Sequence, residues 1–152
     1  MLVRPYDLDF VVALLDSHAA LLGGSLAPPE LSPRDAADWL YGEAGFAVLA
    51  HDTQADPCFV FANLAAQRVF EREWSELVGI PSRLSAQPGE RAERAALLDA
   101  VQRDGYSRDY RGLRVAKSGR RFWIEQTVLW NVRDAAGALV GQAAMFASTR
   151  PA

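Results

Sequence analysis

The side chains best suited to bind a ligand in this 152-residue chain are two arginines and two glutamines. Arg83 and Arg114 have no obvious acidic partner nearby in sequence, and a guanidinium group binds carboxylates and phosphates through paired N–H donors. Gln126 and Gln142 can each donate and accept hydrogen bonds. One hypothesis is that these four side chains ring a small polar or anionic ligand. The alternative is that they bond to one another and to Asn63 in a solid core.

The two histidines and the single cysteine suggest structural roles. His18 lies on an apolar stripe, where we expect a core or interface role. His51 ends an apolar run next to Asp52, so a hydrogen bond to the backbone is the expectation. No second histidine or spaced carboxylate accompanies either one, which argues against a metal or haem site. Cys58 starts an apolar run and is expected to be buried; one cysteine excludes an internal disulfide.

Catalytic signatures are absent from the sequence. Nucleophile-elbow, P-loop and dinucleotide motifs do not occur. His51 and Asp52 are neighbours whose side chains would diverge in a strand, which argues against a general-base dyad.

Composition narrows the classes of partner. The formal net charge is -3 and no stripe of lysines and arginines occurs, which argues against nucleic-acid binding. The first residues lack a cationic segment followed by an apolar run, and no window is long and apolar enough for a membrane span. We therefore expect a cytoplasmic globular domain that does not bind membranes.

Hydrophobic periodicity predicts the elements that position these residues. Ser32 and Pro33 indicate a helix start, and Gly23 and Gly24 a helix end. The expected helices span residues 8–22, 33–42, 64–70, 74–78 and 89–105. The expected strands span residues 46–50, 58–62, 106–116, 121–132 and 139–147.

Two passages of the chain resemble the PAS fold. Residues 59–66 resemble the PAS passage in which a strand runs into an asparagine, here Asn63, and a helix of small residues. Residues 117–137 resemble the PAS hairpin with its two glycine-containing turns. The resemblance implies an α+β fold, with a five-stranded antiparallel sheet that carries helices on one face and follows two N-terminal helices.

A narrower resemblance, spanning residues 41–146, is to the bacterial MEKHLA domain family. It rests on the segments HDTQADPCFVFANLAA, LVGIPSRLSA, SGRRFWIEQTVLWNV and GQAAMF. That family is similar to PAS domains, and we know of no reaction assigned to it. We accordingly expect an N-terminal helical extension at residues 1–44 and a PAS-like MEKHLA domain at residues 45–149.

The spacing from Asn63 to Ser82 also looks like that of LOV domains, the flavin-binding branch of PAS. Ser82 stands where the reactive cysteine of LOV domains would be, and a hydroxyl cannot replace that thiol. Arg114 and Ile124 stand where two asparagines would hold the flavin. The resemblance therefore assigns no cofactor, and non-covalent flavin binding is the alternative.

The PAS resemblance implies which face of the strand at 121–132 lines a cavity. Its inward set would be Phe122, Ile124, Gln126, Val128 and Trp130, while Trp123, Glu125, Thr127, Leu129 and Asn131 would face outward. The predicted ligand-binding residues are then Asn63, Ser82, Arg83, Arg114, Gln126, Trp130 and Gln142.

The sequence favours a non-catalytic PAS-like module for sensing, ligand binding or protein interaction, with homodimerisation as one way to act. The alternative is a small enzyme or a non-covalent cofactor binder that uses the central cavity. The helix at 8–22 is the feature that discriminates between these two classes. Its stripe could cover the sheet's outer face or pair with a second chain, and both options favour function through contacts with a partner.

Overall fold

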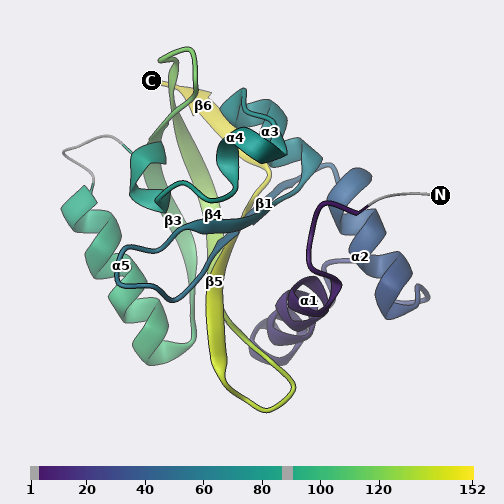
Figure 1. Ribbon diagram of the computed structural model, residues 1–152. Coiled ribbons are helices and arrows are strands. Elements are labelled where there is room, and N and C mark those ends of the chain that lie inside the picture. Colours follow the sequence, from purple (N-terminus) through teal and green to yellow (C-terminus); the bar gives the residue numbers. More distant parts are fainter. Residues whose placement is uncertain (1–3, 87–90) are drawn as a thin grey trace.

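The computed structural model describes residues 4–86 and 91–152, without the side chains at 91–94 and 98. In these residues the chain forms an antiparallel sheet of six strands with helices against both faces (Figure 1). The strands are β1 Ala47–His51, β2 Phe59–Ala62, β3 Tyr106–Val115, β4 Arg121–Arg133, β5 Leu139–Phe146 and β6 Ser148–Pro151. The helices are α1 Leu8–Leu22, α2 Pro33–Gly42, α3 Leu64–Phe70, α4 Trp74–Leu77 and α5 Arg91–Asp104, with a 3-10 turn η1 at Ser82–Ser85.

The strand order is β2-β1-β5-β4-β3, with β6 paired to β4. The predicted α+β class and antiparallel sheet are confirmed. The sixth strand is an addition to the expected five. It pairs with Phe122–Glu125 of β4, and its exposed residues gave no apolar alternation to predict it from.

Local signals start and stop the helices where the sequence indicated. Ser32 accepts a hydrogen bond from the backbone of Asp35 at the start of α2, and Gly23 ends α1 with φ 79°. Asn63 caps α3 by accepting from Ala66 N at 3.0 Å. Each cap satisfies backbone groups that the helix itself leaves open.

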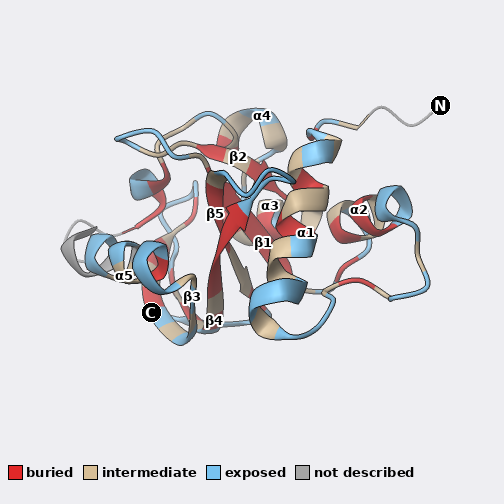
Figure 2. Cartoon of the chain, turned by 90° about the horizontal axis from the view of Figure 1, so that it is seen from below, coloured by how far each residue is buried: buried red, intermediate tan, exposed pale blue. Residues whose placement is uncertain are grey.

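The helices α1 and α2 cover the outer face of the sheet, on the side opposite α5 (Figures 1 and 2). Their buried leucines pack against the β1, β4 and β5 residues Val48, Ala50, Trp130, Val132 and Ala143. The Trp130 indole N–H donates to Leu14 O at 3.1 Å, which ties α1 directly to β4. The apolar stripe of α1 is therefore used within the chain.

The other face of the sheet carries a second apolar cluster. Phe70 and Leu77, from α3 and α4, pack there against Phe122, Ile124 and Phe146. All five residues of β1 are buried because the strand has helices on both sides.

The strand β4 changes face near Gln126, which overturns the predicted inward set. Gln126 has φ 50°, a left-handed conformation, and it is exposed rather than buried. Beyond it, Thr127 and Leu129 line the same cavity as Ile124, whereas Trp130 packs under α1. The period-two rule failed here because it assumes extended backbone throughout the strand.

Candidate functional site

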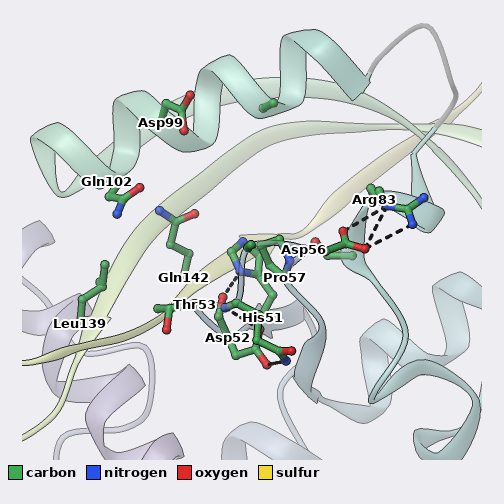
Figure 3. Close-up of a pocket in the computed structure, with 14 residues that line it drawn as sticks. His51, Asp52, Thr53, Asp56, Pro57, Arg83, Asp99, Gln102, Leu139 and Gln142 are labelled. Carbon is green, nitrogen blue, oxygen red and sulfur yellow. Dashed lines mark hydrogen bonds and ion pairs between the residues drawn. The ribbon is translucent and has the colours of Figure 1, made fainter.

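A cleft of about 460 Å³ opens between α5 and the loop that joins β1 to β2 (Figure 3). Its walls are residues 51–57, Ser82 and Arg83 of η1, Ala95, Asp99 and Gln102 of α5, and Leu139 and Gln142 of β5. This volume lies within the usual range for small-molecule sites. Most of these side chains can form hydrogen bonds, so the cleft suits a polar occupant.

Asp52 shapes the loop that forms one wall. Its carboxylate accepts hydrogen bonds from the backbone of Gln54 at 3.3 Å and of Cys58 at 3.0 Å. Burial alone would raise the pKa of Asp52, but the hydrogen bonds from Cys58 and Gln54 outweigh burial and lower the pKa below its usual value. Asp52 is therefore a carboxylate at neutral pH.

Arg83 has the acidic partner that its sequence neighbourhood did not reveal. Its guanidinium donates to both carboxylate oxygens of Asp56, with distances of 3.1 to 3.4 Å. The two side chains are 48% and 54% exposed, so the pair contributes little to stability. It nevertheless balances the charge of Arg83, which weakens the case for an anionic ligand.

Gln142 forms the floor of the cleft and is linked to α5. It donates to Asn131 Oδ1 at 3.1 Å. Asn131 in turn donates from its side chain to Val101 O at 3.1 Å, and from its backbone to Gly105 O at 2.8 Å. The sequence interpretation missed Asn131, since it placed that residue on the outward face.

The two histidines make backbone contacts. His51 is buried, and its Nδ1 lies 2.8 Å from Asp52 O, in line with the expected backbone hydrogen bond. The Nδ1 of His18 lies 2.7 Å from Gly24 O, and its ring contacts Trp130 edge-on. Burial lowers the pKa of His18.

A second, smaller cavity lies against the inner face of the sheet and shares His51 and Gln142 with the cleft. Its volume is about 40 Å³, far below the roughly 300–1,000 Å³ of ordinary small-molecule sites. Arg114 borders it and donates to Leu113 O at 2.9 Å and to the Tyr110 hydroxyl at 3.2 Å.

Two buried hydroxyls border these cavities without a hydrogen-bond partner among the described residues. Ser82, 1% exposed, borders the cleft, and Thr127, fully buried, borders the inner cavity. Buried polar groups are rarely left unpaired, so such hydroxyls indicate where water or a ligand would bind.

The predicted ligand-binding residues divide among five places. Ser82, Arg83 and Gln142 border the cleft, and Arg114 borders the inner cavity. Asn63 is buried, Gln126 is exposed at the break in β4, and Trp130 lies under α1. The prediction missed the cleft residues that come from the β1–β2 loop and from α5, because their approach depends on long-range folding.

Comparison with known proteins gives a family and a fold. The family model of the MEKHLA domain matches residues 8–150. No curated protein matches the chain.

The structure is similar to solved PAS and light-oxygen-voltage domains. The PAS domain of a Colwellia psychrerythraea protein superposes with a TM-score of 0.66 at 17% identity, over 78% of this chain and 95% of that one. An RNA-binding light-oxygen-voltage receptor gives 0.65 at 25% identity, over 84% of this chain and 35% of the receptor. The Rhodobacter sphaeroides LOV protein gives 0.60 at 17% identity, over 70% of this chain and 61% of that one. These matches establish the PAS fold.

Proposed function

Because the chain belongs to the MEKHLA domain family and has the fold of PAS-type sensory domains, we propose that it senses a small polar ligand bound in the cleft between α5 and the β1–β2 loop. The observation that carries this proposal is the 460 Å³ cleft, whose floor residue Gln142 is hydrogen-bonded toward α5. A ligand there would contact a loop, a helix and the central sheet at once.

The link from Gln142 through Asn131 to α5 supports a signalling role. A ligand that hydrogen-bonds to Gln142 competes with, or reorients, the amide that holds Asn131. Asn131 contacts two carbonyls in the last turn of α5, Val101 O and Gln102 O. Ligand binding would therefore bias the position of α5 against the sheet.

The flavin alternative does not fit the inner cavity. A volume of about 40 Å³ is far below the roughly 300–1,000 Å³ of ordinary small-molecule sites, whereas a three-ring system needs a site of that larger size. Arg114 and Ile124 also border this cavity at the positions where the LOV resemblance would need amides. The ligand proposal accordingly rests on the outer cleft.

Native mass spectrometry of freshly purified chain tests the proposal through a matched pair of variants. Ala95 and Ala96 are both exposed on α5, but of the two Ala95 lines the cleft. We expect a bound mass on the wild-type chain and on Ala96→Trp, and its loss from Ala95→Trp, where the indole fills the cleft. Two results would count against the proposal: a bound mass that is still present on Ala95→Trp, or no bound mass on the wild-type chain purified from any cell extract.

A second candidate function is protein contact through the half of the outer sheet face that carries Trp123. The Arg111 guanidinium stacks on the Trp123 ring at 3.8 Å, and Glu125 pairs with both Arg111 and Arg150. Arginine side chains rather than a helix lie over this half, which favours contact with a second protein, including another copy of the chain. Sedimentation at rising concentration tests the homodimer, and a monomer at every concentration contradicts it.

A further inference from the structure

The charges around the cleft indicate what kind of ligand it would hold. Among the described residues, three aspartates and one arginine line it: Asp52, Asp56, Asp99 and Arg83. The Arg83–Asp56 ion pair neutralises one carboxylate, which leaves Asp52 and Asp99 as net negative charge on opposite described walls. These walls favour a cation over an anion.

Asp99 is the carboxylate best placed to meet a ligand. It lies on α5, the helix above Gln142, and lines the cleft together with Gln102 of the same helix (Figure 3). None of the described residues forms a hydrogen bond or ion pair with Asp99, unlike Asp52 and Asp56, whose oxygens accept from Cys58 and Arg83. An ammonium group of a ligand would supply the donors that Asp99 lacks.

A further observation points to an occupant rather than to a solvated acidic surface. Ser82 borders the cleft, and its enclosed hydroxyl has no partner among the described residues. Buried polar groups are rarely left unpaired, so a water molecule or a ligand group is expected beside this hydroxyl. The described walls include no Phe, Tyr or Trp, so they offer no ring for stacking a flat aromatic ligand.

We infer that the ligand of the cleft is a small aliphatic organic cation with one or two ammonium groups; this inference rests on the proposed function. The described residues contain no group of three His, Cys, Asp or Glu side chains that could hold a metal ion, which favours an organic cation. The ammonium group binds Asp99, and a hydrogen bond from the ligand reaches Gln142.

Three probes with the same four-carbon chain separate charge from shape. Putrescine is a dication, 1,4-butanediol is neutral and succinate is a dianion. We expect an NMR titration of the full chain to show putrescine binding in the cleft more tightly than butanediol, with no succinate binding. Asp99→Asn should weaken putrescine binding about fivefold, the factor expected for one exposed ion pair.

The control substitution is Asp16→Asn, which removes the same charge from an exposed position on α1 outside the cleft. It should leave putrescine affinity unchanged. Equal losses in Asp16→Asn and Asp99→Asn would show diffuse attraction to an acidic protein and overturn the inference. If butanediol or succinate binds as tightly as putrescine and Ala95→Trp blocks that binding, the cleft is a ligand site but the inference of a cationic ligand is wrong. If none of the three probes binds, the inference of a cationic ligand is also wrong. Native mass spectrometry then tests the sensory proposal separately.

Discussion

At the scale of single residues, Asn63 joins three elements through one buried amide. Its oxygen accepts from Val48 N at 2.9 Å and from Ala66 N, and its nitrogen donates to Leu40 O at 3.0 Å and Phe46 O at 2.9 Å. The amide thus fastens α2, β1 and α3 together. This use of every hydrogen-bonding group favours the structural role over a ligand contact for Asn63.

We predict that Asn63→Ala lowers the free energy of unfolding by about 2–4 kcal/mol, because it leaves several buried backbone groups unpaired. Urea unfolding of the purified protein measures the change. The control is Ser32→Ala, which removes an exposed cap with one hydrogen bond to Asp35 and should cost about 1 kcal/mol. Equal losses in the two variants would contradict the special role of Asn63.

A second residue-scale contact joins the N-terminal segment to α2. Both Asp38 oxygens accept from Arg4, at 2.6 and 2.7 Å, and the Tyr6 hydroxyl also donates to this carboxylate. The Arg4 hydrogen bond outweighs burial and, with the Tyr6 hydrogen bond, lowers the pKa of Asp38. Burial, with the Asp38 hydrogen bond, raises the pKa of Tyr6 to about 12.

The lowered pKa of Asp38 makes stability depend on pH in a defined direction. Its contribution is fully present above the unfolded-state pKa of about 3.9 and is lost as pH falls through the lower folded-state value. We expect Asp38→Asn to unfold at a lower temperature than wild type at pH 7, and the two melting temperatures to converge as pH falls below the unfolded-state value of about 3.9 and through the lower folded-state value. A gap that stays constant down to pH 2 would contradict this assignment.

At the scale of elements, the helix ends were predictable and the geometry of β4 was not. Caps such as Ser32 and Asn63 act within one turn of chain, so sequence carries the whole signal. The face change at Gln126 coincides with Asp109 of β3, which has φ 61°. The partner strand is interrupted at the same level, between β5 and β6. Such a break is set jointly by three strands, and no single stretch of sequence encodes it.

We predict that Gln126→Gly raises the free energy of unfolding by up to about 1 kcal/mol. Glycine adopts φ 50° without the strain of a Cβ atom, and this relief exceeds its entropic cost. The exposed glutamine side chain contributes little packing. The control is Arg121→Gly, at an exposed position of the same strand whose φ is not left-handed. This substitution should lower the free energy of unfolding by about 1 kcal/mol. Destabilisation by both substitutions would show that Gln126 carries no strain.

At the scale of the whole molecule, the sheet is a central layer with buried residues on both sides (Figure 2). The PAS resemblance predicted the sheet and the helices on one of its faces. For the other face, the apolar stripe of α1 left two options, which were cover by α1 itself or pairing with a second chain. The chain itself provides the cover, since Val11, Leu14 and Leu40 are fully buried against that face. The cleft residues Asp52 and Asp99 could not be paired from sequence, because a loop and a helix 47 positions apart meet there.

The division of the chain into an N-terminal extension at residues 1–44 and a domain at residues 45–149 stays a prediction. The packing of α1 and α2 against the sheet indicates how to test it. A chain shortened to residues 45–152 would expose the outer face, including Val48, Trp130 and Val132. Each large apolar side chain left bare costs about 1.5–3 kcal/mol of burial. The summed cost for these side chains is a large part of the net stability of a domain this size, about 5–15 kcal/mol, or all of it.

We therefore expect the shortened chain to bind the dye ANS strongly and to unfold without a cooperative transition, while the full chain unfolds in one step. Leu14→Ala in the full chain is the graded control, since it removes one side chain from the same interface and should cost about 2–5 kcal/mol. A shortened chain that unfolds cooperatively and does not increase ANS fluorescence would establish residues 45–152 as an independent domain. In that case α1 and α2 would be a cover that can detach, and the face beneath them would become available to a partner.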